Sequence, residues 1–371
     1  MRNTLCLGGL VTDESEAFEQ EPVTAPAGRP ESQDGWSRGR DSDGSQSADD
    51  VHPDETAEFP VETVSVIGGF WRRTLAFALD SILLGVVGAV VGSALFDALA
   101  NLGAWGRLLG FGLSLAYFAS LDSSFGGGAT LGKRVLKLRV VNRSGECISL
   151  GRAALRYSIL AAPIYLNQLM LPTSMLTGIG GVALNTLLFG LGGATMYLYV
   201  FNRRTRQATH DLAAGTFVVG AASNGPVEGK VWRTHLILAA VWVAFVAAGS
   251  VWAGTAAMSK LPPGLLRAVT AIEATGDTHS ATVFIGKTWG DDGETDYVNV
   301  SSALKKNPGG RSEAISQELA TLVLREFPEA NDVDQVSVTI SRGFDIGIAS
   351  GWKRSSVSKS PQEWLDSKSA P

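Results

Sequence analysis

Cysteine and histidine are scarce in this chain of 371 residues, which limits the chemistry that its side chains can support. The two cysteines, Cys6 and Cys147, lie in different regions and are too few for a disulfide framework or a cysteine metal site. No pair among the four histidines has the spacing of metal ligands. Because no serine or cysteine motif of a hydrolase is present either, we expect neither catalysis nor a bound metal or cofactor.

Charge is also scarce, and the two signs are separated along the chain. Residues 1–60 contain four arginines against fourteen Asp and Glu, and residues 260–371 contain twelve basic against fifteen acidic residues. Residues 61–259 reverse this balance, with fifteen basic and seven acidic residues. A basic, hydrophobic middle region between acidic flanks is typical of a membrane domain that meets the anionic headgroups of a lipid bilayer. A nucleic-acid partner is not expected.

Three regions follow from this distribution. Residues 1–65 are rich in Asp, Glu, Ser, Gly and Pro and almost lack large apolar side chains, so we expect a disordered acidic tail. Residues 66–256 are predicted to form an α-helical integral membrane domain. Residues 257–371 are predicted to form a small α+β soluble domain, with one or two helices packed on an antiparallel sheet.

The apolar segments of the middle region predict about five transmembrane helices. The predicted helices cover residues 70–99, 105–121, 153–171, 179–201 and 234–253. Pro163, Asn167 and Gln168 leave open whether the third helix crosses the membrane straight, is kinked or is partly re-entrant.

The first predicted helix contains a carboxylate, Asp80, in an otherwise apolar run. Arg73 lies seven residues earlier, so the two side chains share a helix face about 10 Å apart along the axis. A charge in hydrocarbon costs on the order of 3 kcal/mol unless it is paired or hydrated. Two interpretations remain open, namely a buried hydrogen bond or ion pair that holds helices in register, and a proton or cation site.

His210 and Asp211 form a second polar cluster, either as a helix cap or at the cytoplasmic mouth of a pathway through the membrane.

The basic loops predict the orientation of the membrane domain. The stretch from Asp122 to Arg156 is strongly basic and is expected on the cytoplasmic side, together with the basic loop that follows the fourth helix. Within this stretch, residues 134–141 and 146–150 predict a β-hairpin at the membrane surface. The predicted basic cytoplasmic surface consists of Lys133, Arg134, Lys137 and Arg139.

Two further patterns suggest ligands but lack the context that those ligands need. Gly127–Lys133 matches the first part of a phosphate-binding loop, but Arg134 replaces the magnesium-binding Ser or Thr, and we expect a strand rather than a helix to follow. The acidic run Asp291–Asp296 lacks the spaced ligands of an EF-hand loop and is predicted to be a solvated turn.

Several short motifs, in this order and spacing, resemble the RDD family of bacterial membrane proteins, which is named for an arginine and two aspartates. They are Arg73 with Asp80, Gly128–Arg134 running into Val140-Val141, Ser149–Ala153, and His210-Asp211 with Ala214–Thr216. The resemblance covers about residues 67–220. It assigns the arginine to Arg73, the first aspartate to Asp80, and the second to Asp211 in preference to Asp122. It implies a compact helical domain in the bacterial cytoplasmic (inner) membrane, with transport or ion exchange suggested for some members.

Two functions are therefore considered. In the first, the chain is a secondary transporter or cation/proton exchanger in which Asp80 binds the ion or proton, and a homodimer forms through the glycine-rich helix faces. In the second, the chain is a non-catalytic anchor or scaffold whose C-terminal domain binds an envelope protein or ligand. Five crossings place the N-terminus in the cytoplasm and residues 257–371 on the extracytoplasmic side in both cases.

Overall fold

The computed structural model describes residues 65–167, 169, 178–290 and 293–367. These residues all belong to one compact unit. The predicted acidic tail, apart from Ser65, lies outside the described residues, as does part of the acidic run Asp291–Asp296.

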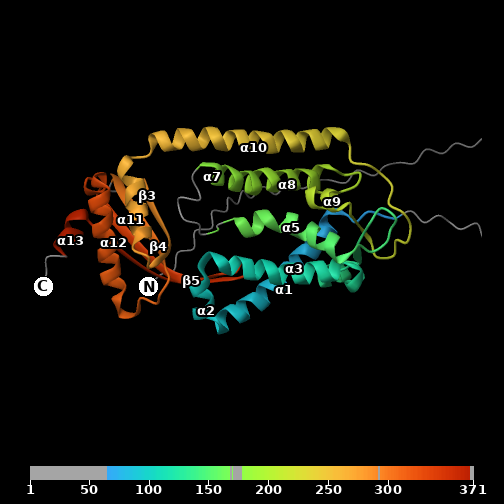
Figure 1. Cartoon of the computed structure of the whole chain (residues 1–371), viewed down its shortest axis with the longest axis horizontal. Helices are drawn as coiled ribbons and strands as arrows, with labels where there is room; N and C mark the ends of the chain where they lie inside the picture. Colours follow the sequence, from blue (N-terminus) through green and yellow to red (C-terminus); the bar gives the residue numbers. More distant parts are fainter. Residues whose placement is uncertain (1–64, 168, 170–177, 291–292, 368–371) are drawn as a thin grey trace, which may run out of the picture. The chain divides into compact units, whose positions relative to one another are not determined.

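Three helices of the first part of the unit are long and apolar enough to cross a membrane (Figure 1). These candidate spans are Phe70–Ala94, Gly178–Phe201 and Arg233–Ala256. The second consists of α7 (Gly178–Asn185), a π-helical segment η3 (Thr186–Leu191) and α8 (Gly192–Phe201). The third lies in α10 (Arg233–Lys260). The prediction of a helical membrane domain is thus supported in broad terms.

Two shorter helices correspond to the other predicted crossings. They are α3 (Gly106–Asp122) and α5 (Leu150–Leu166), each of 17 residues. In the region of the third predicted helix, α5 ends at Leu166 because Asn167 takes an extended conformation, while Pro163 stays inside the helix. The first ends at Ala94 rather than at 99, because Leu95 leaves the helical region before α2 (Phe96–Leu102) begins.

The predicted β-hairpin at residues 134–150 is wrong. Thr130 accepts a hydrogen bond from the Lys133 N–H and caps the short helix α4 (Leu131–Val135), which occupies the start of the predicted strand. Lys137, at φ 51°, then turns the chain into β1 (Leu138–Val141). This strand pairs antiparallel with β2 (Phe217–Gly220) and not with residues 146–150. A local hydrophobic pattern could not show this partner, which lies far along the chain.

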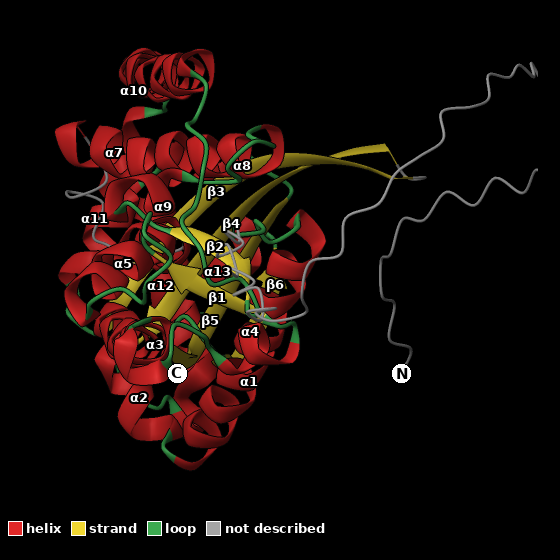
Figure 2. Ribbon diagram, turned by 90° about the vertical axis from the view of Figure 1, so that its right-hand side faces the viewer, coloured by secondary structure: helices red, strands yellow, loops and turns green. Residues whose placement is uncertain are grey.

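The C-terminal region is an α+β domain built on a four-stranded sheet in the order β3-β4-β5-β6 (Figure 2). Its strands are β3 (Thr278–Gly290), β4 (Gly293–Leu304), β5 (Gln335–Asp345) and β6 (Ser350–Lys359). Its helices are α11 (Pro263–Ala274), α12 (Ser312–Glu326) and α13 (Pro361–Asp366). Short 3₁₀ turns in the unit are η1 (Gly103–Trp105), η2 (Ser124–Gly126), η4 (Gly309–Arg311) and η5 (Pro328–Asn331).

The predicted sheet was wrong in two respects. The sheet is mixed, because β4 and β5 run parallel and are joined by a crossover through α12. The sequence of residues 345–350 also predicts a strand, but most of this segment is the connection between β5 and β6. Valines of β4 and β5 and apolar side chains of α11 and α12 form the core of the domain; they include Val298, Val300, Val338, Ile272 and Val323.

The end of β5 and its connection to β6 pack against the helices α1, α2 and α3. Phe344 and Ile346 form a buried cluster with Leu99 of α2. On α1, a Cβ at Gly92 would lie 2.1 Å from the Phe344 ring, and on α3 a Cβ at Gly110 would lie 1.6 Å from the Ile346 carbonyl oxygen. Only glycine permits this approach, so the glycine faces of α1 and α3 contact a segment of the same chain.

Candidate functional site

Asp80 is almost completely buried, at 1% exposure, and three hydrogen-bond donors surround its carboxylate. Oδ1 accepts hydrogen bonds from the Tyr117 hydroxyl and from the backbone N–H of Gly132, both at 2.7 Å. Oδ2 accepts one from the Thr130 hydroxyl at 2.6 Å. The donors come from α3 and from the start of α4, so the carboxylate joins both to α1. This is the geometry of a hydrogen bond that holds helices in register.

Five other charged side chains form a chain of alternating charge, hereafter the ion-pair chain. Its members, in order of contact, are Arg73, Asp211, Arg156, Asp122 and Lys133. The successive N···O distances of the first three pairs are 2.7, 2.9 and 2.9 Å, and Lys133 Nζ lies 2.7 Å from Asp122 Oδ2. Buried ion pairs need complementary partners on all sides, because an unpaired charge in such a place is costly. The chain links α1, α9, α5, α3 and α4.

The short helix α9 (Thr209–Ala214) positions Asp211 at the centre of this chain. Asp211 lies in the first turn of the helix, where its carboxylate accepts a hydrogen bond from the Ala208 N–H at 3.4 Å and from the Thr216 hydroxyl at 3.3 Å. Gly215 ends the helix in the left-handed conformation, at φ 60°, which places Thr216 beside the carboxylate. The residues His210–Thr216 therefore fix the position of the Asp211 carboxylate.

The electrostatics around α9 favour a charged Asp211 beside a neutral His210. Burial alone would raise the pKa of Asp211, but the positive charges of its neighbours, including Arg156 and Arg73, lower it well below the usual range. Burial, with a smaller contribution from the nearby Arg156 and Arg73, lowers the pKa of His210 to about 3. His210 Nε2 lies 3.6 Å from the Asp211 carboxylate, and its Nδ1 is buried without a hydrogen-bond partner among the described residues.

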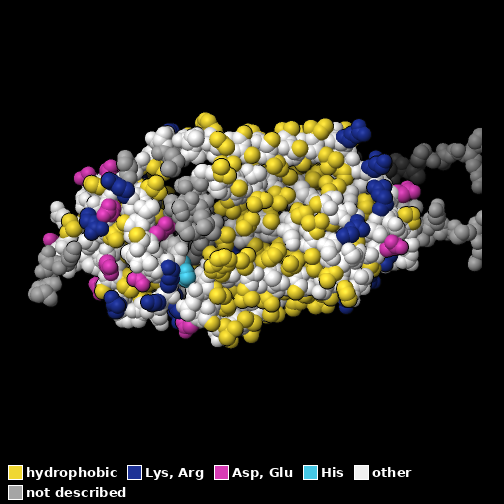
Figure 3. Space-filling view, viewed as in Figure 1, with side chains coloured by type: hydrophobic (Ala, Val, Ile, Leu, Met, Phe, Trp, Pro, Cys, Tyr) yellow, Lys and Arg dark blue, Asp and Glu magenta, His cyan; other side chains and the backbone are white. Residues whose placement is uncertain are grey.

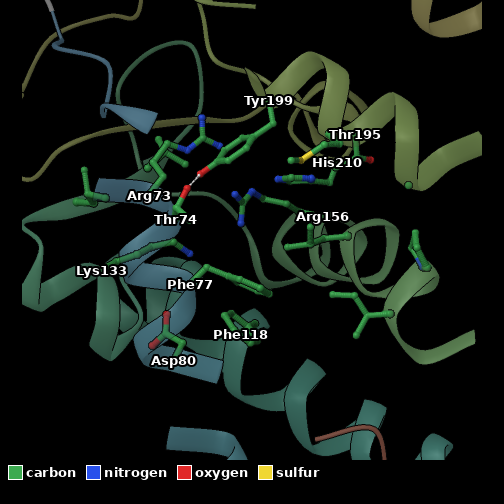
Figure 4. A pocket seen from close by; sticks show the side chains of 17 residues that line it. Arg73, Thr74, Phe77, Asp80, Phe118, Lys133, Arg156, Thr195, Tyr199 and His210 are labelled. Atoms are coloured by element: carbon green, nitrogen blue, oxygen red, sulfur yellow. Dashed lines mark hydrogen bonds between the residues drawn. The ribbon is translucent and has the colours of Figure 1, made fainter. Parts of the chain in front are cut away.

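A cavity of about 300 Å³ lies beside the ion-pair chain. Its walls come mainly from α1, α5 and α8, and Arg73, Arg156, Lys133 and His210 contribute to its lining. Figure 4 shows the Lys133, Arg156 and His210 side chains pointing toward the same space. Most of the remaining lining is apolar, including Phe77 and Phe118.

The predicted site residues Arg73, Asp80, His210 and Asp211 lie close together in the structure. Their hydrogen-bond and ion-pair partners include residues that the sequence analysis did not predict. Arg73, Asp80 and His210 all line the cavity, and Asp211 adjoins it through both arginines. Arg156 was not predicted as a site residue, although it binds both candidates for the second aspartate, Asp122 and Asp211. The only sequence signal for Arg156 was its place in a basic stretch, which pointed to a surface.

The predicted basic surface is only partly present. Lys133 does not belong to it, because its side chain is 11% exposed and pairs with Asp122 in the interior. Arg134 and Lys137 are exposed, and Arg139 is half-buried and donates to backbone carbonyls of Gly145 and Ser223. The argument against a phosphate-binding loop included the expectation that a strand follows Lys133. That expectation was wrong, because the helix α4 follows Thr130. The amine of Lys133, which would have to reach a phosphate, is nonetheless hydrogen-bonded to the Asp122 carboxylate.

Comparison with known proteins identifies one family match. Residues 67–215 match the model of the RDD family. This segment runs from the start of α1 through α9 and contains the whole ion-pair chain together with Asp80. No curated protein and no solved structure matches the chain.

Proposed function

Because this chain carries an RDD-family domain at residues 67–215, we propose that it is a membrane scaffold that fixes its C-terminal domain at the extracytoplasmic face for binding an envelope partner. The observation that carries this proposal is the close packing of the β5–β6 connection on the glycine faces of α1 and α3. A domain that only needed a tether would not require such a contact.

Polar contacts support the same arrangement at the edge of the apolar packing. Arg107 Nε of α3 donates to the Asp345 carboxylate at 3.0 Å, and Arg342 of β5 pairs with Asp97 of α2. Arg107 and Arg342 are buried, at 8% and 7% exposure. Two buried cations paired across one contact favour a single, fixed position of the domain.

The surface of the helices supports placement in a bilayer with five passes. Large apolar side chains are exposed along α1, α3 and α10, and Figure 3 shows a hydrophobic band over the helical region with Lys and Arg at its edge. We propose that α1, α3, α5, α7–α8 and α10 each cross the bacterial inner membrane, with the β1–β2 side in the cytoplasm. This orientation follows from Arg72, Arg203 and Arg233 near the corresponding helix ends.

A projecting ribbon of the C-terminal domain is the surface that we propose for the partner. The pairing of β4 with β5 begins at Tyr297, so residues 293–296 of β4 pair in the sheet with residues 287–290 of β3 and have no partner in β5 (Figure 2). Phe284 and Trp289 are 58% and 74% exposed near this ribbon. Exposed aromatic side chains on a protruding element are typical of protein-binding surfaces.

The experiment that tests this function is photo-cross-linking in intact membranes. A photoreactive amino acid replaces Trp289 in one variant, and Arg325, which is exposed on α12, in a control. We expect one discrete cross-linked protein from position 289 and none from position 325. No adduct from position 289, or the same adducts from both positions, would contradict the proposal.

Cation/proton exchange is a second candidate, favoured by the fact that Asp80 and the ion-pair chain line one cavity. In this case Asp80 binds the ion or proton, and a homodimer would use a surface other than the glycine faces that the β5–β6 connection covers. Ion flux in reconstituted vesicles tests it. Unchanged rate and pH dependence in Asp80→Asn would rule out this role for Asp80.

A further inference from the structure

The cavity beside the ion-pair chain opens toward the apolar surface of the helical region. Phe77 on α1 and Met196 on α8 both line the cavity and are 36% and 62% exposed, so they form its rim. Behind the rim the lining is apolar, with Leu160 and Ile164 of α5 and Phe118 of α3. Under the proposed membrane placement, this opening faces the acyl chains of the lipids.

The inner end of the cavity is polar. The three cations Lys133, Arg156 and Arg73 line it and are paired in the ion-pair chain with two carboxylates that do not belong to the lining. Asp80 also lines the cavity, but three donors already occupy its oxygens. The cationic side chains, by contrast, still include a free donor on Arg156, so an anionic group is the complement of this end.

Two nitrogen atoms at the inner end of the cavity can each form a further hydrogen bond. Arg156 donates through Nε and Nη1, and no hydrogen bond engages its Nη2 among the described residues. His210 is 4% exposed, and its Nδ1 is buried without a partner in the part of the chain that the structure describes. If Nε2 carries the proton that faces Asp211, Nδ1 is an acceptor. A ligand that supplies both an ionised oxygen and an O–H group satisfies both atoms.

We propose that this cavity binds a membrane amphiphile with a phosphate head group, which contacts Arg156, Lys133 and His210 while its acyl chain passes between Phe77 and Met196. The inference rests on the membrane placement in the proposed function but not on partner binding by the C-terminal domain. A phosphate monoester carries between one and two negative charges near neutral pH and so retains an O–H group in part of the population. A cavity of about 300 Å³ is at the lower end of ligand pockets, consistent with a head group and the start of one chain.

The test uses the full-length protein in nanodiscs of zwitterionic lipid and an alkyl phosphate that carries a photoreactive diazirine in its chain. Adducts are mapped by mass spectrometry after irradiation. Competitors are dodecyl phosphate, dodecyltrimethylammonium and inorganic phosphate. Met196→Trp fills the rim, and Phe189→Trp is the matched control, because Phe189 is also 62% exposed but does not line the cavity. The thermal stability of each variant is measured alongside.

We expect adducts on the cavity-lining segments of α1, α5 or α8 and at least fivefold less labelling in Met196→Trp than in Phe189→Trp at unchanged stability. Dodecyl phosphate should compete at concentrations at least tenfold below those of the other two competitors. Equal competition by the cationic amphiphile, or equal labelling of both variants, would overturn the proposal. If inorganic phosphate competes as well as dodecyl phosphate, the cavity is a site for free phosphate, and the proposal of an amphiphilic ligand is overturned. A failed cross-link at position 289 with intact cavity labelling would count against the partner proposal alone.

Discussion

The guanidinium group of Arg73 lies 2.7 Å from the carboxylate of Asp211, although 138 residues separate them in the sequence. Arg73 lies in the first turn of α1 and Asp211 in α9, so this pair joins the two ends of the segment that matches the RDD family. The remaining members of the ion-pair chain connect the same pair to α3, α4 and α5. The charged residues thus hold α1 and α5, which form two of the main walls of the cavity, to α3, α4 and α9.

The first prediction follows from the position of Asp211 in the ion-pair chain, where it pairs with two arginines, while Arg73 pairs with one carboxylate. Asp211→Asn leaves both Arg73 and Arg156 without a paired charge at this point, whereas Arg73→Met leaves Asp211 paired with Arg156. We expect Asp211→Asn to lower the free energy of unfolding by about 3–5 kcal/mol and Arg73→Met by less. Thermal unfolding in detergent measures the order, with Glu228→Gln as an exposed control. The reverse order would contradict the assigned partners.

The second prediction concerns Asp80. Asp80→Leu leaves three donors unsatisfied, two of them buried, and should lower the free energy of unfolding by about 3 kcal/mol, since each buried unsatisfied group costs roughly 1–3 kcal/mol. Asp80→Asn keeps one acceptor oxygen and should cost about half as much. Denaturation of the purified variants measures both. Equal losses would show that charge, rather than the hydrogen bonds, decides the stability.

The third prediction is a pH dependence that arises from His210. Its pKa is lowered to about 3 in the folded protein, against 6.5 for an ordinary histidine, so between these values the unfolded chain binds a proton that the folded protein does not. The free energy of unfolding therefore falls as the pH falls below about 6.5, by up to about 2 kcal/mol at pH 5. The pKa of Asp211 is lowered too, so its contribution is lost only below about pH 4.

Thermal unfolding between pH 7 and pH 5 separates these contributions. We expect His210→Gln to flatten the pH dependence over this range, while the control His235→Gln, at a partly exposed histidine, retains it. An identical slope in wild type and His210→Gln would contradict the buried, neutral state of this histidine.

The fourth prediction uses two glycines of α3. A Cβ at Gly110 would collide with the Ile346 carbonyl oxygen, whereas nothing lies within 4 Å of a Cβ at Gly112. Gly110→Ala should therefore loosen the C-terminal domain and speed its release by limited proteolysis, at a cost of about 1–3 kcal/mol. Gly112→Ala should be neutral or slightly stabilising, since alanine favours helices. Faster proteolysis in both variants would indicate a general effect of helix packing instead.

The sequence predicted the helices and the two regions better than it predicted contacts. Apolar length located α1, α3, α7–α8 and α10 closely, because membrane-type helices form from local composition. It failed at β1, whose partner β2 lies beyond α9, and at Lys133, which a count of basic residues assigned to the surface. Pairing across long sequence distances depends on tertiary structure, which local patterns do not contain.

Glycine spacing illustrates the same limit. The small-residue spacing of Gly88 and Gly92 on the first predicted helix predicts the close approach of a neighbour, but it does not identify that neighbour. The hypothesis of a homodimer assigned the glycine-rich faces to a second copy of the chain, whereas Phe344 at the end of β5 occupies the face of Gly92. A small-residue spacing specifies how near a partner comes and not what the partner is.

The most direct test of the account is a disulfide between α1 and the β5–β6 connection in native membranes. A Cβ at Gly88 would lie 3.0 Å from the Ala349 Cβ, close to the separation in a disulfide. In a background with Cys6→Ser and Cys147→Ser, we expect Gly88→Cys with Ala349→Cys to cross-link rapidly on mild oxidation, and Gly112→Cys with Ala349→Cys not to do so. Cleavage between α10 and α11 before electrophoresis makes the cross-link visible as a retained fragment. Absence of the Gly88–Ala349 cross-link in folded protein would contradict a C-terminal domain fixed on the membrane helices.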